Sequence, residues 1–208
     1  RLWRPLANPT RLRLSMFGDE NPKGFGLQQR SRDFEHFDDE TARFDLRPSA
    51  WVTPMADWGS GAVQLVEIPS NAERNENIVA FWRPRTPLPA GQAHRIAYRL
   101  TFADNGPDEA PLARVSATRA GPPESGSQAL RVAVDFVGVP PDAEALRAAL
   151  FANGEALEDP TLTSLPGGRI RAGFTLPEPR GEETELRLTL ESAAGPASET
   201  WLYRWSAP

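Results

Sequence analysis

Residues 130–136 read LRVAVDF, and apolar side chains at every second position alternate there with small or charged ones. Strict alternation is typical of a β-strand that buries one face. The same period, or a short apolar run, recurs along the chain between turn-forming residues. These further segments are 12–16, 62–68, 78–82, 96–102, 170–176, 186–190 and 201–205. The sequence therefore predicts an all-β fold.

The composition of the 208 residues limits the classes of function. The 21 prolines and 16 glycines favour many turns over long helices. A formal net charge of −5 disfavours a protein that binds nucleic acid along its phosphate backbone. The chain has no cysteine, which excludes disulfides and thiolate ligands, and its two histidines are too few for a histidine-based metal site. We expect no cofactor and no metal.

A stretch rich in proline, glycine and acidic residues, Ala103–Gln128, predicts a linker or long loop. We therefore expect one domain over residues 1–104 and, after a boundary near residue 105, a linker and a second domain over 105–208. The strand rhythm of the second domain is typical of an immunoglobulin-like sandwich, although the Cys…Trp…Cys pattern is absent. One helix is expected between Asp142, as its N-cap, and Gly154. A weaker helix is expected over Asp38–Arg43.

The region Asn21–Trp82 combines three kinds of side chain that suit a sugar site. Carboxylates supply acid and base groups, aromatic rings supply flat apolar faces, and arginines supply forked donors. The carboxylates are Asp33, Asp38, Asp39, Asp45, Asp57 and Glu67; the rings are Phe34, Phe37, Trp51, Trp58 and Trp82; the arginines are Arg30, Arg32, Arg43 and Arg47. Each of these residues also has an ordinary structural interpretation, as solvated charge or as core.

Asp33, Asp38 and Asp39 are the candidates for acid–base chemistry. A general acid needs a pKa raised by burial or by a second carboxylate, and the neighbouring Phe34 and Phe37 would supply burial. If this segment is a strand, Ser31 shares a face with Asp33 and can hydrogen-bond its carboxyl. His36 and His94 lie in no nucleophile motif, which argues against Ser/His/Asp catalysis.

Glycines and tryptophans of the region leave two interpretations open. Gly24 and Gly26 mark either a bend in a strand or a place where the backbone closely approaches a ligand. The tryptophans are either core residues or stacking surfaces for sugar rings. Trp58 is expected to be the most exposed of them because it lies in the turn-like segment 57–61, DWGSG.

Six separated blocks closely resemble the periplasmic glucans biosynthesis proteins G and D (MdoG/OpgG type). They are WRPLANP (3–9), DENPKGFGLQQRSRDF (19–34), RPSAWVTP (47–54), DWGSGAVQLVEIP (57–69), NENIVAFWRP (75–84) and SETWLYRW (198–205). The resemblance implies a periplasmic protein that acts in the biosynthesis of β-1,2-linked glucans. It implies a large β-sandwich of galactose-mutarotase type followed by a small immunoglobulin-like β-sandwich. Family members are much longer, so this chain resembles their C-terminal part.

The resemblance also implies roles for single residues. Some members are similar to inverting endo-β-1,2-glucanases, which need two carboxylates about 6.5–9.5 Å apart. Asp33 would be the acid and Asp39 the second carboxylate, with the base in the part of the protein outside this sequence. Residues expected to contact the glucan are Arg30, Arg32, Arg47, Trp51, Trp58 and Glu67.

This chain departs from the family pattern at two places. The family usually has Asp where Ser31 stands, and Tyr-Gln-Asp where Phe37-Asp38-Asp39 stand. Three functions therefore stay open: a β-1,2-glucanase, a non-catalytic glucan-binding or scaffold protein, and a structural module that docks onto a membrane-bound glucan synthase. A homodimer is a further expectation.

Overall fold

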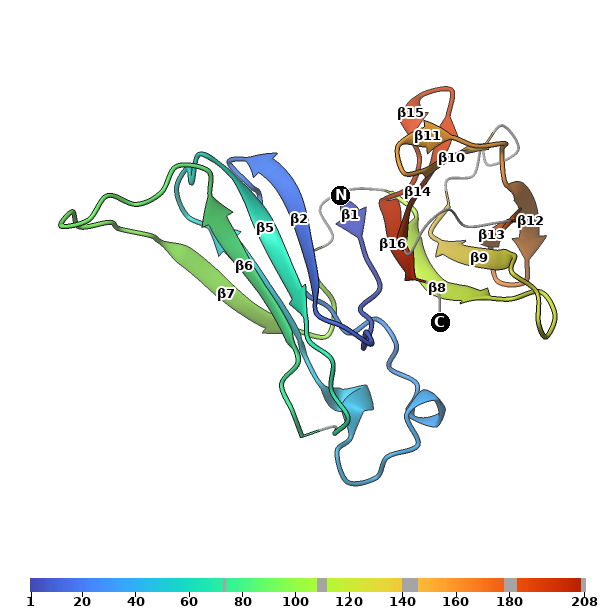
Figure 1. Ribbon diagram of the computed structural model, residues 1–208, viewed down its shortest axis with the longest axis horizontal. Coiled ribbons are helices and arrows are strands. Elements are labelled where there is room, and N and C mark those ends of the chain that lie inside the picture. The colour runs from blue at the N-terminus through green and yellow to red at the C-terminus, as the bar shows by residue number, and fades with distance from the viewer. Residues whose placement is uncertain (73, 108–111, 140–145, 178–182, 207–208) are drawn as a thin grey trace. The chain divides into compact units, whose positions relative to one another are not determined.

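The computed structural model of the chain describes residues 1–72, 74–107, 112–139, 146–177 and 183–206, nearly all of whose regular structure is β-strand (Figure 1). The predicted all-β class is confirmed. The chain divides into two compact units. The C-terminal unit comprises Arg1–Pro5 and Ala110–Pro208, and the N-terminal unit comprises Leu6–Glu109. No helix among the described residues is long and apolar enough to cross a membrane.

The C-terminal unit contains two sheets that share one core. The six-stranded sheet runs in the order β1 (Leu2–Trp3), β16 (Thr200–Ser206), β14 (Glu183–Ser192), β10 (Arg147–Ala152) and β11 (Glu155–Ala156), with β15 (Gly195–Pro196) paired to β14. The four-stranded sheet runs in the order β12 (Thr161–Leu165), β13 (Arg169–Leu176), β9 (Leu130–Val137) and β8 (Arg114–Gly121). The first strand of the chain thus completes the sheet that holds its last strand.

The alternate apolar side chains of β9 (Leu130, Val132, Val134 and Phe136) form part of the core of this unit. These inward side chains are buried together with those of β14, because successive side chains of a strand point to opposite faces. Trp201 of β16 joins the two sheets: its indole N–H donates to Thr118 Oγ1 at 2.9 Å, and its ring meets Phe174 edge to face at 6.3 Å. The two sheets therefore pack face to face around Trp201.

Two local predictions for this unit are wrong. The first is the helix expected to end at Gly154, where the structure instead has the strand β10 and a hairpin turn to β11. The expected N-cap, Asp142, lies within residues 140–145, which are outside the described residues. Asn153 and Gly154 have φ of 50° and 85°, the left-handed pair that a two-residue hairpin turn requires. The expected linker contains β8, whose small residues and arginines hide its alternation.

The N-terminal unit contains two three-stranded sheets, β2–β5–β6 and β3–β4–β7. The strands are β2 (Arg13–Glu20), β3 (Phe25–Leu27), β4 (Ser49–Pro54), β5 (Ser60–Glu67), β6 (Ile78–Pro84) and β7 (Tyr98–Ala103). Two 3-10 helices, η1 (Phe34–His36) and η2 (Phe44–Leu46), lie between β3 and β4. Trp58 links the sheets, since its ring contacts Phe25 and Tyr98 of one and Trp82 of the other.

The alternation of apolar and polar residues correctly predicted strands in this unit, but it did not predict which face of each sheet is buried. In β2 the polar Arg13 and Ser15 are buried, whereas Leu14 and Met16 are exposed. Pairing through β5 places Leu14 and Met16 on the same face as Val79 and Phe81 of β6. The alternating side chains of β7 are exposed as well. An apolar face is therefore present but uncovered within this unit.

Candidate functional site

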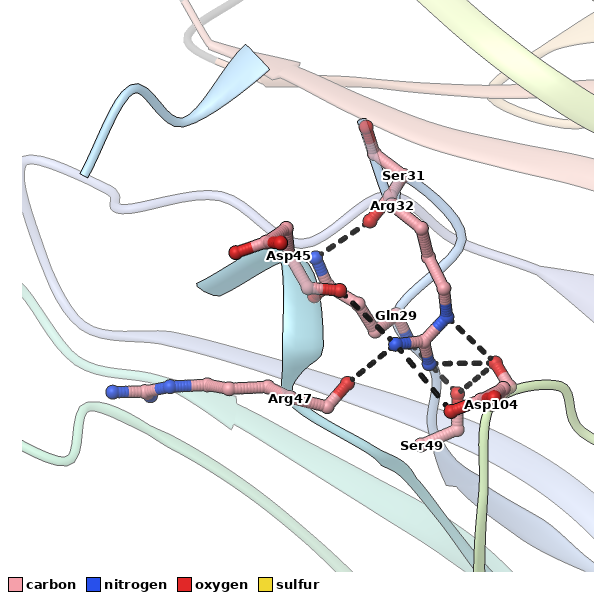
Figure 2. Close-up of polar contacts among 7 residues, drawn as sticks. All are labelled: Gln29, Ser31, Arg32, Asp45, Arg47, Ser49 and Asp104. Carbon is pink, nitrogen blue, oxygen red and sulfur yellow. Dashed lines mark hydrogen bonds and ion pairs between the residues drawn. The ribbon is translucent and has the colours of Figure 1, made fainter. Parts of the chain in front are cut away.

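The segment of residues 28–48, between β3 and β4, contains most of the predicted site residues, and Arg32 holds it in place (Figure 2). Its guanidinium donates to the Asp104 carbonyl at 3.0 Å from Nε and 2.6 Å from Nη2. Nη1 donates to the carbonyls of Arg47 at 2.9 Å and Asp45 at 3.3 Å. Arg32 was expected to bind substrate. Its donors instead point at backbone carbonyls, so it positions the segment.

Three further hydrogen bonds support the same closure (Figure 2). The Gln29 backbone N–H donates to Ser49 Oγ at 3.1 Å, and Ser49 Oγ donates to the Asp104 carbonyl at 3.4 Å. The Gln29 side-chain amide donates to the Ser31 carbonyl at 2.8 Å. The start of β4, the end of β7 and residues 29–32 are thereby tied together.

The ion pair of Arg43 and Asp45 orders the second half of the segment. Arg43 Nε and Nη2 donate to the two Asp45 carboxylate oxygens at 3.0 and 2.8 Å, and Asp45 is buried. The hydrogen bond from Arg43 lowers the pKa of the Asp45 carboxyl below its ordinary value. The helix expected over Asp38–Arg43 is wrong, because both end residues are left-handed, with φ of 48° and 45°.

A hollow of about 430 Å³ lies beside this pair, lined by Phe34, Glu40 and Arg43. The Arg43 guanidinium lies 5.5 Å from the centroid of the Phe34 ring. An aromatic face, a carboxylate and an arginine together can stack on a sugar ring and hydrogen-bond its hydroxyls. Glu40 was missed in the sequence, where nothing distinguishes it from a solvated surface acid.

Asp33 is the N-cap of η1 and is exposed. Its Oδ1 accepts the Glu35 backbone N–H at 3.2 Å, and 59 % of its side chain is solvent-accessible. The burial by phenylalanines expected for a general acid is therefore not present in this state. Ser31 does not bond the Asp33 carboxyl as expected: its hydroxyl lies 3.0 Å from His36 Nδ1.

The contacts of Ser31, His36 and Asp33 do not form a catalytic triad. Asp33 Oδ2 lies 4.0 Å from His36 Nδ1, the same nitrogen that contacts Ser31. A triad needs the hydroxyl and the carboxylate on opposite ring nitrogens, so that one accepts the proton while the other is held. This geometry agrees with the sequence-based argument against Ser/His/Asp catalysis.

Asp39 forms a local turn. Its Oδ1 accepts the backbone N–H groups of Thr41 and Ala42 at 2.9 and 2.8 Å. Asp33 and Asp39 thus each use Oδ1 to accept backbone N–H groups of the segment. Arg47 lies nearby in sequence with its guanidinium 4.3 Å from the Phe44 ring centroid, and it is exposed.

The other predicted contact residues lie outside this segment or at its beginning. Arg30 is half-buried just after β3. Trp51 of β4 packs over Gly24, where an added Cβ would lie 2.5 Å from the indole nitrogen. The close approach that Gly24 allows is therefore that of Trp51 to the backbone.

Trp58 and Glu67 have packing roles. Trp58 is half-buried among Phe25, Trp82 and Tyr98 rather than presented at a turn. Glu67 of β5 is 1 % exposed, and its Oε1 accepts the Ala7 backbone N–H at 2.8 Å. Neither side chain is joined to Asp33 by a contact within the described part of the chain.

A larger hollow, of about 540 Å³, lies at one end of the β2–β5–β6 sheet. Its lining is Met16, Gly18, Asp19, Ser60, Gly61, Ala62, Arg83, Pro84 and Arg85. It offers no aromatic ring for stacking, so the smaller hollow at Phe34 suits a sugar better. Within the described ranges, no three histidine, aspartate or glutamate side chains cluster as metal ligands.

We expect Arg32→Met to lower the free energy of unfolding of the N-terminal unit by about 1–2 kcal/mol, because the carbonyls of Asp45, Arg47 and Asp104 lose charge-assisted donors. Arg47→Met is the matched control. It removes the same charge from an exposed position and should cost less than about 1 kcal/mol. Urea denaturation followed by hydrogen exchange of the unit measures both. Equal stability of the two variants would contradict the positioning role of Arg32.

Comparison with known proteins places this geometry in context. Residues 1–205 match the protein-family model "Periplasmic glucan biosynthesis protein, MdoG". The chain is 39 % identical over 221 residues to glucans biosynthesis protein D of Xanthomonas campestris pv. campestris, covering 100 % of the chain and 42 % of that protein. It is 40 % identical over 212 residues to glucans biosynthesis protein G 2 of Shewanella oneidensis, covering 100 % of the chain and 39 % of that protein.

A third relative gives the same result. Glucans biosynthesis protein G of Rhodopseudomonas palustris is 43 % identical over 209 residues, which are 99 % of the chain and 41 % of that protein. The chain therefore spans only about two fifths of the length of the curated relatives it matches.

Proposed function

Because the chain belongs to the MdoG family of periplasmic glucan biosynthesis proteins, we propose that it binds the β-glucan and processes it by inverting hydrolysis in the periplasm. The proposed substrate is a glucan with a β-1,2-linked backbone. No metal or cofactor is required by this chemistry, since two carboxylates and a water molecule suffice.

The observation that carries the proposal is the hollow at Phe34. Its aromatic face, with Arg43 and Glu40 beside it, is the combination that sugar binding needs. Arg43 is fixed by its two hydrogen bonds to Asp45, and the segment is fixed by Arg32. A site whose side chains are held before the ligand arrives loses less entropy on binding.

In the proposed mechanism Asp33 is the general acid. Its protonated carboxyl donates a proton to the glycosidic oxygen as the bond from that oxygen to the anomeric carbon breaks. A base takes a proton from water, whose oxygen attacks the anomeric carbon from the opposite face. Asp39 is the proposed second carboxylate within this chain, and the base that activates water is proposed to lie outside it.

The exposure of Asp33 gives substrate binding a role in this mechanism. A carboxyl with 59 % of its side chain accessible is well hydrated. Covering it with a glucan chain removes that water and so disfavours a charged carboxylate there. Glucan binding would therefore prepare Asp33 for proton transfer.

The contacts of the other predicted site residues decide the roles that we propose for them. Phe34 takes the stacking role first expected of Trp58, whose ring is engaged by other aromatics. Trp51, Arg30 and Arg47 remain proposed glucan contacts. We assign Glu67 a structural role, because it is buried against Ala7.

We also propose which kinds of sandwich the two units form. The N-terminal unit would be the last part of a galactose-mutarotase-like β-sandwich, and the C-terminal unit would be an immunoglobulin-like β-sandwich. Contact with a membrane-bound glucan synthase and a homodimer remain proposals that the resemblance motivates.

A non-catalytic role as glucan carrier or scaffold is the second candidate. It is favoured by the exposure of Asp33 and by the hydrogen bond of Ser31 to His36 rather than to a carboxyl. Both candidates share the binding hollow, and hydrolysis distinguishes them.

Calorimetry with linear β-1,2-glucan oligosaccharides tests the binding hollow. We expect Phe34→Ala to weaken binding about tenfold, since a stacked ring contributes about 1 kcal/mol beyond its buried area. Phe102→Ala, at an exposed position of β7 in the same unit, is the matched control and should bind as the unaltered protein does. Equal affinity of the two variants would exclude Phe34 as the stacking surface.

A further inference from the structure

The outer face of the β12–β13–β9–β8 sheet gathers arginines (strands labelled in Figure 1). The side chains of Val132, Val134 and Phe136 face the core, so the residues between them and their partners across the sheet face outward. These outward residues include Arg114, Arg119, Arg131, Arg169 and Arg171. No comparable concentration of arginine occurs in the other described sheets.

Asp135 is the only acidic residue among the described strand residues of this face. It is 0 % exposed, and Arg171 binds it through both oxygens, from Nε to Oδ1 at 2.6 Å and from Nη2 to Oδ2 at 2.8 Å. Arg119 Nη1 also donates to Oδ2, at 3.0 Å. The carboxylate thus fixes two guanidinium groups on the face while its own charge is hidden. Counted over the described strand residues of this face, five arginines and one aspartate give a formal charge of +4.

The opposite surface of the same unit has a different charge pattern. The outward residues of the six-stranded sheet include Arg147, Arg187 and Arg204, balanced by Glu183, Glu185 and Glu191. Arg204 is paired with both Glu185 and Glu183. The positive charge of the unit is therefore segregated on one of its two faces, although the chain as a whole has a net charge of −5.

The other side chains of the arginine face indicate the kind of partner. Threonines at positions 161, 163 and 175 lie between the arginines, and no large apolar side chain of the described strands is exposed there. A protein partner ordinarily needs buried aromatic or aliphatic anchors. A flat surface of phosphates needs only cationic side chains, and arginine matches phosphate oxygens with two donors.

We propose that this face lies against the phosphate headgroups of an anionic membrane surface. The contact is electrostatic and peripheral, because the only large apolar side chains of the described strands on this face, Val137 and Leu165, are half-buried. It would hold the protein at the membrane with one orientation, since the rest of the chain is acidic and is repelled by the same surface.

Sedimentation of the protein with vesicles tests the proposal. We expect binding to vesicles of phosphatidylglycerol and phosphatidylcholine, no binding to phosphatidylcholine alone, and loss of binding at high salt. The double substitution Arg119→Gln/Arg131→Gln should weaken binding roughly thirtyfold, from about a fivefold effect for each arginine near the surface. Arg131→Gln alone should show the fivefold effect, and it leaves the Asp135 cluster intact.

The double substitution Arg147→Gln/Arg187→Gln is the matched control. It removes the same charge from exposed positions of the opposite face and should leave vesicle binding unchanged. No vesicle binding, or an equal loss in both double variants, would overturn the proposal. Binding to a soluble polyphosphate but not to vesicles would also overturn it, and would assign the face to an anionic polymer.

Discussion

Replacement of Asp33 by asparagine in the complete protein is expected to slow β-1,2-glucan hydrolysis by about a hundredfold to ten-thousandfold, while glucan affinity changes by less than about twofold. An amide has the shape of the carboxyl but no proton to give the leaving oxygen. Its oxygen can still accept the Glu35 N–H, so η1 should keep its start. Rates of reducing-end release at saturating glucan, with affinity from calorimetry, measure the two effects separately.

Asp38→Asn is the matched control for this substitution. Asp38 is exposed in the same segment and has φ of 48°, a conformation that asparagine adopts as readily as aspartate. We expect it to leave hydrolysis within about twofold, as for an ordinary solvated carboxylate. Unchanged turnover in Asp33→Asn, or equal losses in both variants, would remove Asp33 from the role of acid.

Replacement of Arg171 by methionine is expected to lower the free energy of unfolding of the C-terminal unit by about 3–5 kcal/mol, because it leaves a buried carboxylate without its principal partner. Arg119→Met removes a single hydrogen bond from a more exposed arginine and should cost about 1 kcal/mol. Hydrogen exchange at the amides of β9 and β13 reports on this unit alone. Similar losses in the two variants would contradict the dominance of Arg171.

The pH dependence gives a second readout of the same pair. The hydrogen bond from Arg171 lowers the pKa of the Asp135 carboxyl, so its stabilising contribution is complete above the unfolded pKa of about 4 and is lost as the pH falls through the folded value. In Arg171→Met, burial is less well opposed and the pKa rises. The stability difference between the two proteins should therefore shrink as the pH is lowered below about 4. A constant difference would argue against an ionic origin.

Much of the fold could be predicted from the sequence, because alternation in segments such as Leu130–Phe136 reflects burial directly. The hairpin at Asn153–Gly154 was missed because Ala-rich residues before it satisfy a helical pattern equally well; the turn decides between the two. Alternation in β2 and β7 also located strands. It could not show that their apolar faces are uncovered, since that depends on neighbours outside these strands.

The candidate site was predictable in composition but not in geometry. The sequence predicts a sugar site from a segment rich in carboxylates, rings and arginines, and Arg43 and Phe34 of that segment do meet. The positioning role of Arg32 could not be predicted from the sequence, because the Asp104 carbonyl that it binds lies 72 residues away in the chain. Nothing in the sequence predicts that Glu40 belongs to the site, since only the fold of the segment places it beside Phe34.

The most direct test is incubation of the complete protein with linear β-1,2-glucan, while binding, reducing ends and product anomers are followed together. We predict saturable binding and release of oligosaccharides with inverted anomeric configuration. Binding without release would assign the protein to the carrier role and direct attention to Ser31 and Phe37. Absence of both binding and release would contradict the glucan site at residues 28–48.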